Sequence, residues 1–164
     1  MRVRIFVLAA FCCGLFGAAQ AGDGRFPATG TPALTFHMPD DWTQQPDGDG
    51  SIMLISGNKT SSLALSLSPY TGTLDDLAAG SMKAADAAPP QNMGPTEISG
   101  HQGFMYDSTL TTQGGTLVHM HMIAVKIDAN TIASVTMLTV DGISPADLET
   151  AQGVMYTMRL VVTP

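Results

Sequence analysis

The sequence predicts an α+β fold in which an antiparallel β-sheet of about six strands, with an N-terminal hairpin, is flanked by two main helices. The stretch from Thr116 to Val140 has the pattern of two long strands joined at residues 128–130. Helical segments beginning after Thr73 and Ser144 carry apolar residues at helical spacing. Both faces of strand 116–127 are largely apolar, so we expect each face to be covered.

Residues 1–21 have the pattern of a secretory signal peptide. A short basic region, Met1 to Arg4, precedes an apolar run from Ile5 to Phe16, and Ala19-Gln20-Ala21 matches a signal peptidase site. The apolar run is shorter than the about 20 residues that span a bilayer. The sequence therefore predicts cleavage after Ala21, a periplasmic or secreted protein, and no transmembrane segment after signal cleavage.

The expected mature chain of 143 residues is acidic and has no cysteine, because Cys12 and Cys13 both lie in the signal. It has five Lys and Arg residues against fourteen Asp and Glu residues, a formal charge of −9. This charge argues against nucleic acid or an anionic membrane as the partner. Its length suits one domain, which we place at residues 33–164 after a flexible arm at residues 22–32 that is rich in Gly and Pro.

The first strands of the domain are set by alternation and turn residues. Ala33 to Met38 alternates and ends at Pro39, and Trp42 is expected to pack in the core. Residues 51–56 and 62–68 form a hairpin, in which Leu63, Leu65 and Leu67 mark a buried face.

Both helices have recognisable starts. Thr73 is an N-cap with Asp76 in an approximate capping box. Ser144 is the second N-cap, and Pro145 takes the first helical position. The apolar stripe of the second helix comprises Leu148, Ala151, Met155 and Met158.

The turns on either side of strand 116–127 predict its pairing. A two-residue turn at Gly114-Gly115 would pair His119 with Leu110 and His121 with Ser108. A three-residue turn at Asp128 to Asn130 would pair His121 with Met137. Alternation places His119, His121 and Ile123 on one face, with Met120 and Met122 on the other.

The sharpest chemical hypothesis is a copper site formed by His119, His121 and Met137. Two residues apart on a strand, the histidines have Cα atoms about 7 Å apart, which two imidazoles can span to one ion. Imidazole and thioether ligands together favour copper, particularly Cu(I). The alternative is that Met120, Met122 and Met137 are core residues and that the histidines lie where the strand emerges from cover.

The order of these elements resembles the PsbP-like superfamily. The residues that carry the resemblance are Phe36-His37-Met38-Pro39-Asp40-Asp41-Trp42, Thr73-Leu74-Asp75-Asp76-Leu77-Ala78, the Ile98 to Gly103 corner, and a terminal helix from Ser144 to Leu160. The superfamily includes the extrinsic photosystem II protein, the DcrB-type exported bacterial proteins and the Ran-binding Mog-type fold. The resemblance covers roughly residues 33 to 162 and implies an α/β/α sandwich used as a binding or assembly module, with no shared catalytic centre.

Three functions are compatible with these observations. The one we expect is a non-enzymatic binding or assembly module of the cell envelope with a protein partner, because the sequence has no nucleophile elbow, phosphate loop or zincin helix. A periplasmic copper-binding protein is the first alternative. A small-ligand carrier with a closed pocket lined by methionines and by aromatic residues such as Phe104 and Tyr106 is the second.

Overall fold

A computed structural model describes residues 22–48 and 50–162, and the predicted signal peptide lies outside them. The described residues form these elements in chain order: β1 (Gly22–Phe26), β2 (Ala33–Met38), β3 (Thr43–Pro46), β4 (Ser51–Ile55), β5 (Ser61–Pro69), α1 (Leu74–Ala85), β6 (Asn92–Ile98), β7 (His101–Thr111), β8 (Leu117–Lys126), β9 (Thr131–Val140), α2 (Pro145–Thr157) and β10 (Arg159–Val161).

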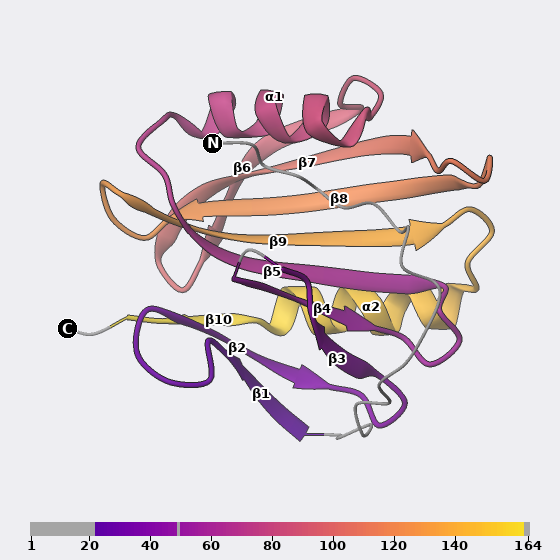
Figure 1. Ribbon diagram of the computed structural model, residues 1–164, viewed down its shortest axis with the longest axis horizontal. Coiled ribbons are helices and arrows are strands. Elements are labelled where there is room, and N and C mark those ends of the chain that lie inside the picture. Colours follow the sequence, from indigo (N-terminus) through magenta and orange to yellow (C-terminus); the bar gives the residue numbers. More distant parts are fainter. Residues whose placement is uncertain (1–21, 49, 163–164) are drawn as a thin grey trace.

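The strands form two antiparallel sheets. A seven-stranded sheet has the order β3-β4-β5-β9-β8-β7-β6, and a three-stranded sheet has the order β1-β2-β10 (Figure 1). The expected α+β fold is therefore confirmed, with a larger main sheet and a separate small sheet that holds the strand from Ala33 to Met38.

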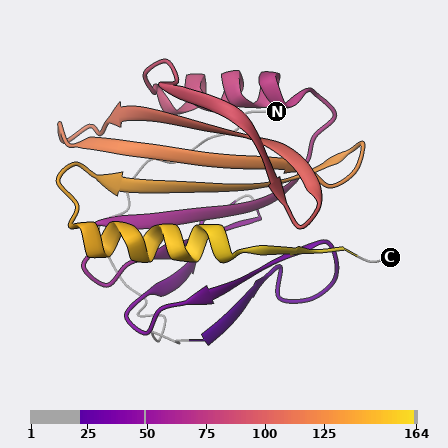
Figure 2. The same ribbon diagram turned by 180° about the vertical axis from the view of Figure 1, so that it is seen from behind.

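The large sheet lies between the two helices. On one face, Leu77, Ala78 and Ala85 of α1 pack with apolar residues of β7, β8 and β9. On the other face, Ala151, Val154 and Met155 of α2 pack with strands of the large sheet and with β2. Figure 2 shows α2 lying along this second face and continuing in the same direction into β10. Both faces of the sheet are thus covered, as the apolar pattern predicts.

The helix starts confirm the sequence analysis. Thr73 and Asp76 form a complete capping box at α1, and the Ser144 side chain accepts a hydrogen bond from the Asp147 backbone at α2. These bonds satisfy amides that would otherwise lack a partner in the first turn. Among the residues that the structure describes, neither helix has the length and apolarity needed to cross a bilayer.

Strand β8 has the faces and the β9 pairing that its sequence predicts. Its register places His121 opposite Met137 and Ile123 opposite Val135. Ile123 and Val125 belong to the core on the α2 side, whereas Met120 and Met122 belong to the core on the α1 side. The three-residue turn fixes this register, since the Ile127 backbone N–H donates to the Thr131 carbonyl at 3.0 Å.

The predicted register between β7 and β8 is wrong by one residue. His121 faces Asp107 rather than Ser108, and His119 faces Thr109 rather than Leu110. The turn is wider than expected, because the Thr112 N–H bonds to the Thr116 carbonyl, and Gly115 takes a positive φ of 80° between them. Since side chains alternate between faces, this shift brings Asp107 to the same face as His121.

The chain ends also differ from expectation. Residues 22–26 of the expected arm form β1, in which Gly24 pairs with Phe36. A Cβ on Gly24 would lie 2.2 Å from the Phe36 ring, so glycine provides the space that the ring occupies. The terminal helix ends at Thr157 rather than Leu160, because the chain turns extended at Met158 and Leu160 pairs with Leu34 in the small sheet.

Candidate functional site

A row of side chains crosses the large sheet on its α2 side and changes from polar to apolar. Successive strand pairings connect Asn92, Asp107, His121, Met137 and Leu63. Asn92 is exposed, Asp107 and His121 are partly buried, and Met137 and Leu63 are buried. Helix α2 packs mainly on β2, β5 and β9, so the polar end of the row, on β6 and β7, lies at the margin of the core.

His121 links this row to α2. Its Nδ1 bonds to a carboxylate oxygen of Asp107, and its Nε2 lies 3.2 Å from the Tyr156 hydroxyl. A carboxylate can only accept, so Nδ1 carries a proton, and in the neutral imidazole Nε2 accepts from the phenol. The His121 and Tyr156 rings meet edge to face, with centroids 5.9 Å apart and planes 70° apart. We call Asp107, His121 and Tyr156 the β7–α2 network.

The environment of the network keeps the phenol protonated. Burial and the nearby negative charge of Asp107 both raise the pKa of Tyr156 above its usual value. A protonated phenol can donate to His121 at neutral pH. Asn92 extends the network at its other end, because its side-chain amide donates to the second oxygen of Asp107 at 3.2 Å.

His119 has a different partner. Its Nε2 lies 3.2 Å from a carboxylate oxygen of Asp141, which directly follows β9, and both side chains are largely exposed. His121 instead bonds to Asp107 on β7, the opposite neighbour of β8. The two imidazoles therefore turn toward opposite sides of their strand.

The structure places the predicted copper ligands on one face without showing them converge on one point. Met137 lies beside His121, as the β8–β9 register predicts, and is buried beneath α2. Among the described residues, no group of three or more His, Cys, Asp or Glu side chains is arranged as a metal site. Thioethers are outside that donor set, so the combination of two histidines with Met137 stays a prediction.

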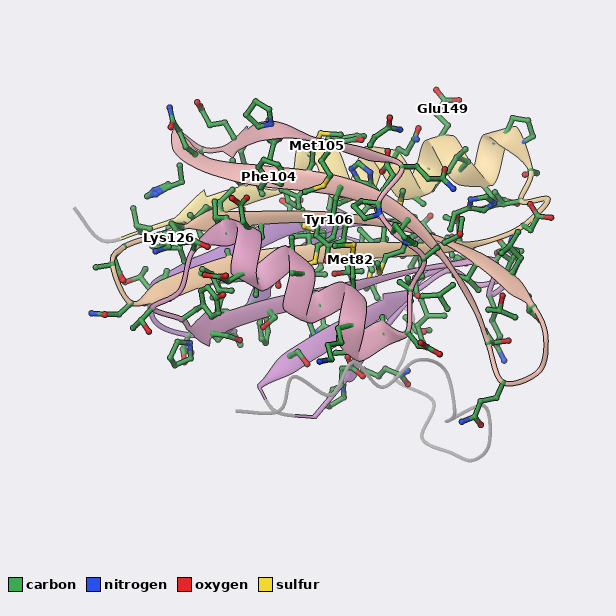
Figure 3. All side chains as sticks on the ribbon, turned by 90° about the horizontal axis from the view of Figure 1, so that it is seen from above. Met82, Phe104, Met105, Tyr106, Lys126 and Glu149 are labelled. Atoms are coloured by element: carbon green, nitrogen blue, oxygen red, sulfur yellow. The ribbon has the colours of Figure 1, made fainter. Side chains whose placement is uncertain are left out.

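Tyr106, which the sequence analysis names as a lining residue of a carrier pocket, lies on the α1 side of the sheet. Figure 3 shows Tyr106 close to Met82 of α1, whereas its neighbour Met105 lies toward α2. Tyr106 is fully buried, and its hydroxyl donates to the Met122 sulfur at 2.6 Å. Burial raises the pKa of Tyr106 to about 12, so it is a neutral core residue at physiological pH.

Sequence reasoning missed Asp107, Asp141 and Tyr156. Recognising Gly115 as the positive-φ residue of a three-residue turn would have placed Asp107 opposite His121. The sequence also holds a signal for Tyr156. It directly follows Met155 of the predicted apolar stripe, so it is an aromatic residue on the more polar side of the last helical turn.

Comparisons with known proteins identify the fold only. No protein-family profile matches the sequence. No curated protein matches it either. Several solved structures are similar to it despite low sequence identity.

The cyanobacterial PsbP protein from Synechocystis sp. PCC 6803 is 14% identical, with a TM-score of 0.64 over 92% of this chain and 98% of that one. LpqN, described as involved in cell envelope biogenesis of Mycobacterium tuberculosis, is 14% identical, with a TM-score of 0.63 and coverages of 87% and 91%. A point mutant of the protein Mog1 is 8% identical, with a TM-score of 0.52 and coverages of 87% and 97%.

A protein from Bacteroides thetaiotaomicron is also similar over 78% of this chain, at 17% identity and a TM-score of 0.53, but this chain spans only 45% of its length. Across these four structures the shared feature is the arrangement of helices and strands, at identities that carry no site residues from one protein to another. The chain has the fold shared by PsbP and Mog1.

Proposed function

We propose that this chain is a non-enzymatic binding or assembly module of the cell envelope that contacts a protein partner through the β7–α2 network. The observation that supports the proposal is that Tyr156 is exposed and yet held in a fixed position. Tyr156 is 55% exposed, yet a ring contact and a hydrogen bond to His121 hold its side chain in place. Exposed tyrosines of this kind are common anchors of protein interfaces.

The network lowers the cost of using Tyr156 as an anchor. Ordering a side chain upon association costs about 0.5–1.5 kcal/mol, and a side chain that is already held avoids part of that cost. His121 provides the support, because its side chain is only 12% exposed and is itself held by Asp107. The tyrosine ring offers apolar area, and Asp107 beside it offers hydrogen-bond acceptors.

The arrangement favours binding over catalysis. Both nitrogens of His121 have partners within the protein, one in Asp107 and one in Tyr156. The imidazole therefore orients a phenol whose pKa is raised, which is the opposite of what an activated nucleophile requires. This chemistry supports a role for His121 in positioning Tyr156.

An envelope location is supported by two independent features. Residues 1–21 have the sequence of a secretory signal peptide, and LpqN, a structural neighbour, is described as involved in cell envelope biogenesis. We infer that the chain is exported and that its partner is another protein of the envelope.

Site-specific photo-crosslinking in the producing cells tests this proposal. A photoreactive phenylalanine derivative replaces Tyr156 in one variant and Met93 in a matched control, since Met93 is also exposed but lies on the other face of edge strand β6. We expect a discrete adduct with an envelope protein from position 156 only. The same protein should co-purify with the wild type and the Met93→Ala variant, and be lost with Tyr156→Ala. Equal adducts from both positions, or co-purification that survives Tyr156→Ala, would refute the proposed surface.

Copper binding is a second candidate, favoured by the position of Met137 beside His121. Binding at this place would use His119, His121 and Met137, and it would require the imidazoles to exchange at least one of their present hydrogen bonds for the metal. An anaerobic Cu(I) titration against a competing chelator tests it. Stoichiometric binding by the wild type, lost in His119→Ala/His121→Ala and weakened in Met137→Leu, is expected. Binding that is unchanged in all variants would rule out this site.

The carrier alternative has less support. Tyr106, one of its two proposed aromatic lining residues, is packed between α1 and the sheet with its hydroxyl bonded to Met122. A ligand at that place would have to displace core side chains.

A further inference from the structure

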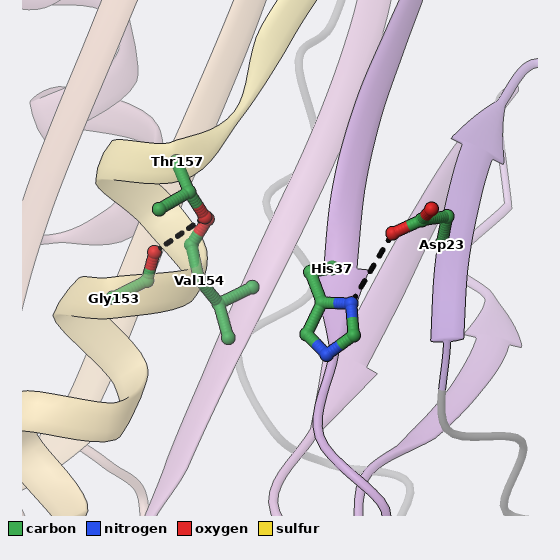
Figure 4. Close-up of polar contacts among 5 residues, drawn as sticks. All are labelled: Asp23, His37, Gly153, Val154 and Thr157. Atoms are coloured by element: carbon green, nitrogen blue, oxygen red, sulfur yellow. Dashed lines mark hydrogen bonds and ion pairs between the residues drawn. The ribbon is translucent and has the colours of Figure 1, made fainter.

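The outer face of the small sheet is a second surface with distinct chemistry. We define it by Asp23 and Arg25 of β1, Thr35 and His37 of β2, and Arg159 of β10. These residues alternate with Leu34, Phe36 and Leu160, which face the core. An open cleft of about 450 Å³ lies over this face, with Thr157 of α2 at its border. Figure 4 shows His37 lying between Asp23 and this last turn of α2.

Two arginines flank the centre of the outer face. Arg25 and Arg159 are both opposite Thr35, on the two strands that border β2. They are two of the five Lys and Arg residues expected in a mature chain with fourteen acidic residues. Since adjacent strands lie about 4.8 Å apart, the two backbone positions are separated by about 10 Å. The outer face thus carries two arginines beside the one carboxylate of Asp23, on an otherwise acidic protein.

Existing hydrogen bonds orient both guanidinium groups. An Arg25 amino group, Nη2, donates to the Gly30 carbonyl. Arg159 donates through Nη1 to the carbonyls at the end of α2, including those of Thr157 at 3.1 Å and Met158 at 2.9 Å. A guanidinium has five N–H donors in a planar fork, so these bonds leave donor capacity for an added acceptor.

The histidine on this face is also oriented. His37 Nδ1 lies 3.2 Å from a carboxylate oxygen of Asp23, and both side chains are largely exposed. Asp23 can only accept, so the proton of this hydrogen bond is on Nδ1 of His37. The contact does not involve Arg25 or Arg159. The cleft is lined by Arg25, Thr35 and Thr157 together with Asp23 and His37. Arg159 lies beside the cleft, on the strand next to Thr35.

We propose that the outer face of the small sheet binds an acidic, extended segment of a protein partner, with two carboxylates of the segment paired to Arg25 and Arg159. In an extended chain of polyproline II conformation, three residues make one turn of about 9 Å, and positions i and i+3 lie on the same side. Acidic side chains at this spacing match the separation of the backbone positions of the two arginines. Arg–carboxylate pairs can be bidentate, which gives direction to an otherwise weak surface contact. The segment lies across the strands and occupies the cleft beside Thr35.

The partner is identified by this charge pattern and not by the Tyr156 surface. The two surfaces lie on different sides of α2: Tyr156 contacts β8, whereas Thr157 borders the cleft over β2. Each can be inactivated without changing residues of the other, so failure of one proposal leaves the other standing.

Fluorescence anisotropy with a labelled peptide of Glu-Thr-Thr repeats, which carries a carboxylate at every third residue, tests the inference on the chain that begins at Gly22. The first variant is Arg25→Gln/Arg159→Gln, and the matched control is Lys83→Gln/Lys126→Gln, which removes two positive charges from α1 and β8. We expect the wild type to bind the peptide with an affinity that falls as the salt concentration rises. The affinity should be at least tenfold lower in the arginine variant. It should stay near the wild-type value in the lysine control and in Tyr156→Ala. A peptide of Gln-Thr-Thr repeats should bind at least tenfold more weakly.

A second variant guards against unfolding, because Arg159 also supports the end of α2. Thr35→Glu places a carboxylate between the arginines and keeps both of them, so it should lower the peptide affinity at least tenfold. Gln45→Glu adds the same charge at an exposed position on β3 and should leave binding unchanged. Equal losses in the arginine and lysine variants, no binding by the wild type, or binding to anionic lipid vesicles in preference to the peptide would each overturn the proposal.

Discussion

The two faces of β8 show how one strand serves both the core and the candidate surface. On the α1 side, Val118, Met120 and Met122 are buried along the strand, and even the polar group of Tyr106 is bonded within the core. On the α2 side, Ile123 and Val125 are buried, whereas His121 is at the margin and His119 is exposed. The α1 side is covered over a greater length of the strand.

The position of α2 explains this difference. It packs along β5, β9 and β2 rather than over β6 and β7. Polar groups that lie beside its edge can reach water and also bond to the helix, as Tyr156 and His121 do. Cover by a helix, rather than strand sequence alone, therefore decides which half of a two-sided strand can contact a partner.

The largest change in the free energy of unfolding is expected at Met120. The comparison is with His119, its neighbour on β8, which points to the opposite face. Met120 is 2% exposed in the α1-side core, whereas half of the His119 side chain is exposed. Met120→Ala should lower the free energy of unfolding by about 2–5 kcal/mol, because it removes buried apolar contacts and leaves a cavity. His119→Ala should change it by less than about 0.5 kcal/mol. Urea unfolding of both variants checks this, and equal losses would contradict the assigned faces.

Tyr106 offers a pH-dependent measure of the same α1-side core. Burial raises its pKa in the folded protein to about 12, while in the unfolded chain it ionises near 10. The contribution of Tyr106 to the free energy of unfolding is therefore fully present below about pH 10. It falls by about 2–3 kcal/mol as the pH rises from about 10 to about 12. Tyr106→Phe should remove this part of the alkaline loss, measured as the difference between the two unfolding curves. An identical loss in the variant would show that another group is responsible.

The network at the margin should contribute less than the core. Asp107→Ala leaves the partly buried His121 without its carboxylate partner and should cost about 1–2 kcal/mol. The matched control, Asp141→Ala, breaks the exposed pair with His119 and should cost less than about 0.5 kcal/mol. Chemical unfolding at neutral pH measures both. A larger cost for Asp141→Ala would reverse our distinction between the two histidines.

The difference between the two histidines also marks where sequence reasoning succeeded. The predicted turn at residues 128–130 has the correct length, and the prediction of Met137 as the β9 neighbour of His121 is confirmed. The turn before β8 contains two consecutive glycines that fit a two-residue turn, and only the structure shows that Thr112 and Thr116 close a longer one. A one-residue error in that turn concealed Asp107, because it moved every β7 side chain to the opposite face.

Long-range pairing set the other limit of prediction. Alternation in Ala33 to Met38 correctly predicts a strand, but alternation does not indicate the sheet to which a strand belongs. The small sheet depends on β1 and β10, which lie at opposite ends of the described chain and both pair with β2. This arrangement brings Arg25 and Arg159 near each other on the outer face. Neither their proximity nor the cleft can be predicted from local sequence patterns.

The smallest expected effect concerns Tyr156, and it separates the needs of the fold from those of the proposed surface. Tyr156→Phe keeps the ring against His121 and removes only the hydroxyl, whose hydrogen bond is at an exposed position. Water can replace such a bond, so the free energy of unfolding should fall by no more than about 0.5 kcal/mol. Thermal unfolding followed by circular dichroism provides the comparison with Met120→Ala. A loss as large as that of Met120→Ala would mean that Tyr156 holds α2 on the sheet. A small loss accompanied by weaker capture of the envelope partner would instead place its main role at the interface.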